Sequence, residues 1–239
     1  MKILAFDSTA RAASVAIVDN EQPLAIFNID NGLTQSELLL PMAEDALRAV
    51  KLSFSDIDLF AATMGPGSFT GVRIGAALIK GLAFGKDTPC VGVSTIEALA
   101  YNMMPHIGVI VPVMDARRQQ VYTAVFTSDG ENLIRECDDM AISCTELAEM
   151  LKKHDGEPIY LVGDGYSVAY KILTENGIKI SPTPKLLINE NAYSVALVAK
   201  KKYEMGEYTT DKEITPTYLR MPQAERERLE RIKATENTK

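Results

Sequence analysis

Short apolar runs separated by polar turns open the sequence, and they predict β-strands. Three such runs lie within the first 30 residues and, because tight connections join them, they predict an antiparallel meander. Apolar residues then recur at helical spacing, and a further strand is followed by two more helices, the second opened by a capping box. These elements are expected, in chain order, at residues 2–6, 14–18, 24–29, 36–50, 58–63, 70–84 and 95–103.

The second half of the sequence repeats this order after a break at residues 104–108, where proline and glycine interrupt the pattern. Asp7 precedes an apolar run by eight residues, and Asp115 precedes another by the same interval. Each half therefore has the order β-β-β-α-β-α, which indicates duplication in order and spacing. The later elements are expected at 109–114, 121–126, 132–136, 144–153, 159–162 and 167–175, with one more helix at 192–205.

This duplicated order is that of the superfamily of actin, hexokinase and Hsp70, the ASKHA group with ribonuclease H-like lobes, in which two lobes flank a cleft. The predicted fold class is therefore α/β and actin-like. We expect an N-terminal lobe over 1–104, a C-terminal lobe over 108–222 and a charged tail over 223–239. The tail mixes acidic and basic residues, so a solvated helix or a disordered end is expected there rather than a basic arm.

The net charge and the cysteine spacing exclude several classes of function for this chain. A formal net charge of −7 argues against a large phosphate-binding face on this chain alone. The three cysteines lack CxxC spacing and match neither a disulfide framework nor a zinc site. No run has the length of a signal peptide's apolar core or of a membrane span, so we expect a cytoplasmic protein with no membrane partner.

In that superfamily the first hairpin of each lobe grips phosphate, because a tight turn lets main-chain N–H groups approach phosphate oxygens closely. The corresponding turns here lack the glycine of the superfamily's Asp-x-Gly turn, and a Gly-Asp-Gly turn stands where adenosine would bind. Two interpretations stay open: contact with ATP or ADP without efficient hydrolysis, or ordinary strand-end turns with vestigial carboxylates. The candidate cofactor-binding residues are Asp7, Ser8, Thr9, Asp115, Arg117, Gly163 and Gly165.

The helix expected at 70–84 is unusually rich in small residues, with Gly71, Gly75 and Gly81 among them. A glycine costs a helix about 1 kcal/mol relative to alanine, so three of them indicate that another backbone comes close. That backbone belongs either to the same lobe or to the helix of a partner.

Six motifs, in the expected order along nearly the whole chain, resemble the TsaB family, also called YeaZ. They are FDST at 6–9, TQSELLLP at 34–41, MGPGSFTGVRIG at 64–75, VGVSTIEALA at 91–100, VMDARRQQVY at 113–122 and PTYLR at 216–220, of which MGPGSFTGVRIG is the most specific. The resemblance implies a non-catalytic subunit that works with a catalytic paralogue, TsaD, and an ATPase, TsaE. That complex transfers a threonylcarbamoyl group from its adenylate to the adenosine beside the anticodon of tRNAs that read codons starting with A.

The resemblance also implies which surface the partners share. In this family the homodimer and the TsaD heterodimer both use the first-lobe helices, here 36–50 and 70–84. The implied subunit requires no cofactor, contacts ATP or ADP at most at a composite site, and meets tRNA indirectly. The predicted interface residues are Leu38, Leu39, Met42, Phe69, Thr70, Gly71, Arg73, Gly75, Ala76 and Ile79.

Two other hypotheses come from different classes. An independent kinase or ATPase of the same fold would turn over ATP with the help of Asp7 or Asp115. A metal-dependent peptidase would need a metal site, but the two histidines, His106 and His154, lie far apart in the sequence, whereas the catalytic paralogue carries a His-x-x-x-His pair. No catalytic and no metal-binding residue is therefore predicted, and each histidine is expected at the surface or in a loop.

Overall fold

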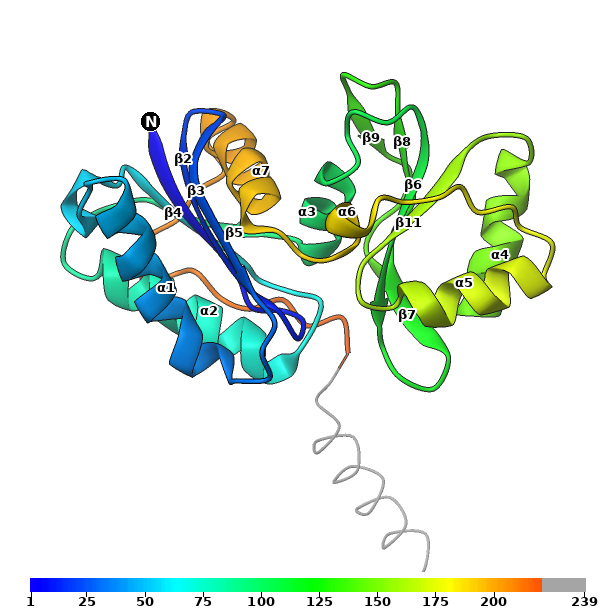
Figure 1. Cartoon of the computed structure of the whole chain (residues 1–239), viewed down its shortest axis with the longest axis horizontal. Helices are drawn as coiled ribbons and strands as arrows, with labels where there is room; N and C mark the ends of the chain where they lie inside the picture. The colour runs from blue at the N-terminus through cyan, green and yellow to red at the C-terminus, as the bar shows by residue number, and fades with distance from the viewer. Residues whose placement is uncertain (221–239) are drawn as a thin grey trace, which may run out of the picture.

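The computed structural model describes residues 1–220, which form two lobes that lie side by side (Figure 1). Layers alternate across the molecule: a pair of helices, the first sheet, a central helical layer, the second sheet and another pair of helices. The tail predicted at 223–239 lies outside the described residues. Within the part of the chain that the structure describes, no helix is long and apolar enough to cross a membrane.

The first lobe is a five-stranded sheet covered by helices on both faces. Its elements are β1 (Lys2–Asp7), β2 (Ala13–Asp19), β3 (Gln22–Ile29), α1 (Gln35–Ala49), a 3-10 turn (Phe54–Asp56), β4 (Leu59–Thr63), α2 (Phe69–Ala83), β5 (Cys90–Val93), α3 (Thr95–Tyr101) and α7 (Ala192–Glu204). The strand order is β3-β2-β1-β4-β5, so the predicted meander is confirmed and parallel strands extend it. One buried cluster joins α1 and α2 to one face of the sheet, and a second joins α7 to the other.

The second lobe is built around one long strand. Its elements are β6 (Gly108–Asp115), β7 (Gln120–Thr123), β8 (Phe126–Ser128), β9 (Leu133–Arg135), β10 (Met140–Ser143), α4 (Cys144–Leu151), a 3-10 turn (Lys152–His154), β11 (Ile159–Val162), α5 (Tyr166–Glu175) and α6 (Lys185–Ile188). β6 pairs antiparallel with β7 and β8 and parallel with β11. The single strand predicted at 121–126 is wrong, because the chain leaves the ladder between β7 and β8 and pairs with two different stretches of β6.

The C-terminal part of the described chain returns to the first lobe. Helix α7 packs on β1 and β2, and Ile214 is buried in the first-lobe core. Thr209 and Cys90 exchange two main-chain hydrogen bonds of 2.9 Å, and the N–H of Thr217 donates to the carbonyl of Met64 at 2.7 Å. The predicted boundary of the C-terminal lobe, 108–222, is therefore wrong for this part, because a helical pattern does not reveal which sheet will cover its apolar stripe.

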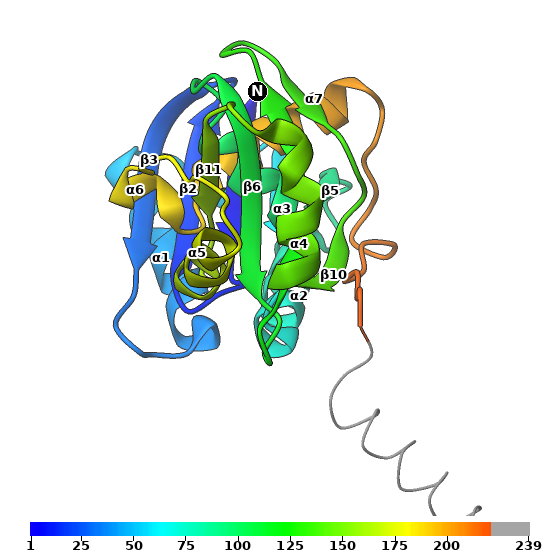
Figure 2. The same cartoon turned by 90° about the vertical axis from the view of Figure 1, so that its right-hand side faces the viewer.

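Helix α3 holds the lobes together. Ile96 and Leu99 of α3, with Met103 just beyond its end, pack on the second sheet, while Ala98 faces the first-lobe cluster around α7. Seen from the second lobe, β6 and β11 stand in front of α3 (Figure 2). Asn102, at the end of α3, donates side-chain hydrogen bonds to two carbonyls of the segment by which the chain crosses back. The two crossings between the lobes are thus tied to each other.

Candidate functional site

A cleft opens between the lobes near the ends of β1 and β6, and its cavity measures about 540 Å³. Arginines, aromatic rings, carboxylates and small polar groups share its walls. The lining residues are Thr9, Ala10, Arg11, Gln35, Gly67, Ser68, Phe69, Met114, Asp115, Ala116, Arg117, Tyr122 and Asp164. The cleft therefore brings together Thr9, Asp115 and Arg117 from the predicted nucleotide-binding residues.

The first of the two turns predicted to bind phosphate, at residues 7–9, is buried under another segment, and we call it the closed turn. Asp7, Ser8 and Thr9 are each exposed by 1% or less. One oxygen of Asp7, Oδ1, accepts hydrogen bonds from the main-chain N–H of Thr9 (2.9 Å) and from its hydroxyl (2.6 Å). Burial raises the pKa of Asp7 to about 6, although these hydrogen bonds lower it. Asp7 and Ser8 would reach a nucleotide only if the segment that covers them moved.

That covering segment is the glycine-rich loop with the start of α2. A Cβ at position 67 would lie 2.6 Å from the carbonyl oxygen of Thr9, and one at Gly75 would lie 2.8 Å from the hydroxyl oxygen of Ser8. At Gly71 a Cβ would fall onto the carbonyl oxygen of Ser8, far inside the 3.0 Å that real Cβ atoms keep. These glycines therefore serve close packing within the lobe, one of the two alternatives that the sequence left open.

The second phosphate turn is open. Asp115 accepts the N–H of Arg117 at 2.8 Å, and Asp164 accepts the N–H of Asp115 at 2.9 Å. Arg117, Arg118 and Gln119 have φ values of +67°, +54° and +58° in succession. Such backbone is costly for residues other than glycine and clusters at ligand sites. The side chain of Arg117 is 87% exposed, so this turn offers a cation at the rim of the cleft.

The two glycines proposed for adenosine contact, Gly163 and Gly165, are buried against β6. A Cβ at Gly163 would collide with the carbonyl oxygen of Val113, and one at Gly165 would lie 3.0 Å from the same atom. Gly163 also has a positive φ of 108°. Packing of the turn against β6 accounts for both glycines, and adenosine contact stays a prediction.

A carboxyl that the sequence analysis did not single out lies behind the cleft. Glu190 is only 4% exposed, in the segment between α6 and α7. Burial raises the pKa of Glu190 to about 8, and the charges of Asp7 and Asp164 add to this increase. Burial raises the pKa of Asp164 as well. No sequence signal marks Glu190, because it lies in an irregular segment and its neighbours in space are distant along the chain.

Most of the predicted interface residues lie inside the first lobe instead of on its surface. Buried side chains or backbone occur at Leu39, Met42, Gly71, Gly75, Ala76 and Ile79. The helices bury this stripe against their own sheet, so the prediction is wrong for these positions. Charged substitutions at Gly75 or Ala76 are therefore expected to unfold the lobe rather than to block pairing selectively.

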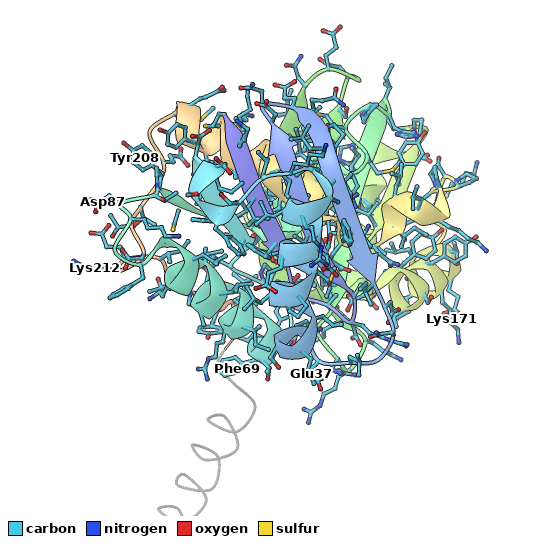
Figure 3. All side chains as sticks on the ribbon, turned by 60° about the vertical axis from the view of Figure 1, so that its left-hand side comes forward. Glu37, Phe69, Asp87, Lys171, Tyr208 and Lys212 are labelled. Carbon is cyan, nitrogen blue, oxygen red and sulfur yellow. The ribbon has the colours of Figure 1, made fainter. Side chains whose placement is uncertain are left out.

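The outward face of the same helices carries a different set of residues. Among the predicted residues, Thr70 and Arg73 are exposed, and Leu38 and Phe69 are half-buried. The face also includes residues that were not predicted: Leu40, Ala77, Gly81 and Phe84, the last 74% exposed. Figure 3 shows α1 and α2 side by side, with Glu37 and Phe69 at the same end of this surface. We call these exposed and half-buried residues of α1 and α2 the outward helix face.

The C-terminal segment is attached to one end of this face. The guanidinium carbon of Arg73 lies 3.8 Å from the centre of the Phe69 ring, and its Nε donates to the hydroxyl of Tyr218 at 2.9 Å. The rings of Phe69 and Tyr218 lie 4.8 Å apart. Phe69 also lines the cleft, so the outward helix face and the cleft meet at this residue.

The histidines and cysteines contribute packing. His154 was expected at the surface or in a loop, but it is buried between Glu157 and Glu136, at 2.8 and 3.2 Å. Cys90 and Cys144 are buried and unpaired. Within residues 1–220, no group of three or more His, Cys, Asp or Glu is arranged to hold a metal ion.

Two sheets, each flanked by helices and joined around a cleft, define a two-lobed protein of the actin-like ATPase class. The same fold occurs in YeaZ from Pseudomonas aeruginosa, with a TM-score of 0.74 and 24% identity over 91% of this chain and 99% of that one. The family model described as TsaD, tRNA N6-adenosine threonylcarbamoyltransferase, matches residues 34–228.

Relatives at higher identity narrow the family further. The tRNA threonylcarbamoyladenosine biosynthesis protein TsaB of Bacillus subtilis is 30% identical over 94% of this chain and 96% of its own length. TsaB of Escherichia coli is 30% identical over 92% and 95%. The chain belongs to the TsaB (YeaZ) family, as the six sequence motifs predicted.

Proposed function

We propose that this chain is a non-catalytic scaffold subunit of the complex that transfers a threonylcarbamoyl group from threonylcarbamoyl-AMP to tRNA. The acceptor is the adenosine next to the anticodon in tRNAs that read codons starting with A. The chain binds a TsaD-type catalytic paralogue and a TsaE-type ATPase in the cytoplasm, and it meets tRNA indirectly. Its family supports the pathway, because the relatives are named as tRNA threonylcarbamoyladenosine biosynthesis proteins.

The observation that carries the docking role is the outward helix face. Ala77 and Gly81 lie four residues apart and are both exposed, and a Cβ added at Gly81 would meet no atom within 4 Å. Small side chains at this spacing let the backbone of a second helix approach closely. Exposed Phe84, three residues after Gly81, and exposed Leu40 on α1 offer further apolar area, and burying one such side chain contributes roughly 1.5–3 kcal/mol.

The same surface suits two partners. A paralogue with the same fold presents equivalent helices, and a second copy of this chain presents identical ones, which would form an isologous homodimer. The two assemblies would therefore compete, and the homodimer would release its face when the paralogue is present.

The cleft supports nucleotide contact without turnover on this chain. Its open turn supplies Arg117, and Phe69 and Tyr122 line the same cavity with aromatic rings, the kind of side chain on which a base packs. The closed turn uses the Thr9 N–H inside the protein, so this copy lacks the free main-chain donors that a γ-phosphate would need. We therefore propose ATP or ADP contact at a composite site and no requirement for a cofactor.

The test combines co-purification with a tRNA modification assay in which each subunit is omitted in turn. Ala77→Glu places a charge on the outward helix face, and Val168→Glu, at an exposed apolar position of α5, is the matched control. We expect the first variant to lose the paralogue and to lower the modification rate at least tenfold, while the control behaves as wild type. Both should keep their unfolding temperatures.

Two results would contradict the proposal. The paralogue could modify tRNA at full rate with this chain absent, which removes the scaffold role. Alternatively, the purified chain could hydrolyse ATP rapidly and lose that activity on Asp115→Ala, which would favour the independent kinase or ATPase.

A further inference from the structure

Three carboxyls meet where the two lobes join. Asp7 ends β1 in the first lobe, Asp164 lies in the turn between β11 and α5 in the second, and Glu190 lies in the segment that crosses back to α7. The charges of Asp7 and Asp164 both act on the carboxyl of Glu190. The crossing segment is bonded to the second lobe at Ile188 and to the first lobe at Ala192, and Glu190 lies between these two residues.

Two oxygens of this cluster lie buried without a hydrogen-bond partner among the described residues: Oδ2 of Asp7 and Oε1 of Glu190. An unpaired ionised carboxylate is costly in such a place, whereas protonation removes the charge. Two further charged groups act on Asp164. They are Asp115, at the end of β6, and Arg117, in the turn that follows.

Main-chain contacts keep Glu190 in place. The carbonyl of Ile188 accepts the N–H of Gly163 at 2.5 Å, and the carbonyl of Asn189 accepts the side-chain amide of Asn102 at 2.8 Å. On the other side, the N–H of Ala192 donates to the hydroxyl of Ser14 at 2.8 Å. Glu190 cannot turn to solvent unless these contacts break, so any charge it carries acts on the junction of the lobes.

We propose that Asp7, Asp164 and Glu190 form a proton-dependent junction between the lobes, which stays closed while Glu190 is protonated and loosens when it ionises. The negative charge of Glu190 would be repelled by two other carboxyls, and no lysine or arginine among residues 1–220 pairs with it. Separation of the β11–α5 turn from the crossing segment would then let water reach Asp7 and Glu190, whereas Asp164 is already exposed in the wall of the cleft.

The sign of the pH dependence follows from the direction of the shift. The pKa of Glu190 is higher in the folded chain than in the unfolded one, so between its ordinary value and about 8 the folded chain keeps a proton that the unfolded chain has released. Stability contributed in this way is complete at acid pH and is lost as the pH rises through that window. The unfolding equilibrium constant should increase by up to about tenfold per pH unit there.

The experiment compares wild type with Glu190→Gln between pH 5 and pH 9, with the exposed Glu175→Gln as a matched control. Unfolding temperatures are measured together with hydrogen exchange of the amides at 163–166 and 188–192. We expect wild type and the control to lose stability and protection as the pH rises. Above the pKa of Asp7, about 6, Glu190→Gln should keep both, because its amide stays neutral.

A second variant decides the matter if Glu190→Gln does not fold. Asp164→Asn removes one of the charges that act on Glu190, so the decline in stability should end at a lower pH than in wild type. The proposal is overturned if wild type and the variant that folds show the same pH profile. It is overturned equally if a divalent cation at millimolar concentration abolishes the pH dependence, because the cluster would then be a cation site.

Discussion

Substitution of Gly71 by alanine tests the central packing contact of the first lobe. The new Cβ would fall onto the carbonyl oxygen of Ser8, a main-chain atom that cannot rotate away. The hydroxyl of Ser8 also donates to the carbonyl of Gly71 at 2.8 Å, so the two segments are bonded where the methyl group would enter. The substitution must push α2 away from the first turn or break this hydrogen bond.

The size of the effect can be worked out from these contacts. Overpacking of a tight interior costs about 1–3 kcal/mol, and a lost buried hydrogen bond adds about 1 kcal/mol. Alanine returns up to about 1 kcal/mol through its better helix propensity. The net loss of unfolding free energy for Gly71→Ala is therefore about 1–3 kcal/mol, which lowers the unfolding temperature by roughly 2–12 °C in a chain of this size.

The same helix contains the matched control. Gly81 is exposed, and an added Cβ would meet nothing within 4 Å, so Gly81→Ala should gain about 0.5 kcal/mol or more. Urea unfolding followed by far-ultraviolet circular dichroism measures both variants. The packing argument is refuted if Gly71→Ala is as stable as Gly81→Ala. If Gly71→Ala loses pairing with the paralogue at unchanged stability, Gly71 belongs to the partner interface, as the sequence analysis predicted.

Two further substitutions test the contacts that join the lobes. Asn102→Ala removes two hydrogen bonds to the crossing segment and leaves the hydroxyl of Ser194 without its acceptor, so a loss of roughly 3 kcal/mol is expected in urea unfolding; a loss below about 0.5 kcal/mol would contradict the role given to Asn102. Ser94→Ala removes the cap of α3 and a hydrogen bond of 2.5 Å to Asp139 in the other lobe. The expected loss of unfolding free energy is about 1–2 kcal/mol, and each kcal/mol lowers the unfolding temperature by roughly 2–4 °C. An unchanged unfolding temperature would show that the cap is dispensable.

The local sequence pattern was sufficient to predict most of the strands and helices. The alternation of apolar runs and turns predicted the meander and the strand at 58–63. The capping signatures at Ser94 and Ser143 correctly placed the starts of α3 and α4, although a reciprocal capping box forms only at Ser143, and Ser94 caps α3 without Glu97 bonding back. These features succeed because they depend on residues within one turn or one strand. Short elements escaped prediction: β5, β10 and α6 have four residues each, too few to show a period.

Which side of a helix packs into the core was harder to predict than the presence of the helix. The stripe containing Leu39 and Ile79 and the outward positions Leu40 and Ala77 are all apolar or small, so helical periodicity alone could not tell a core from an interface. The glycines of α2 posed the same problem. Their number indicated that a backbone comes close, but only the folded chain identified it as the turn at Ser8.

The sequence by itself determined the α/β duplication into two halves, the family, and the presence of acidic turns at the ends of two strands, although the order β-β-β-α-β-α is incomplete in each half because short strands were missed. Tertiary structure alone decided that the first of these turns is closed, that α7 returns to the first sheet, and that Glu190 lies beside Asp7 and Asp164. The physical reason is the distance along the chain over which each effect acts. Propensity, capping and periodicity depend on residues that are close together in the sequence. Burial and the pKa of a carboxyl depend on groups that only folding brings together.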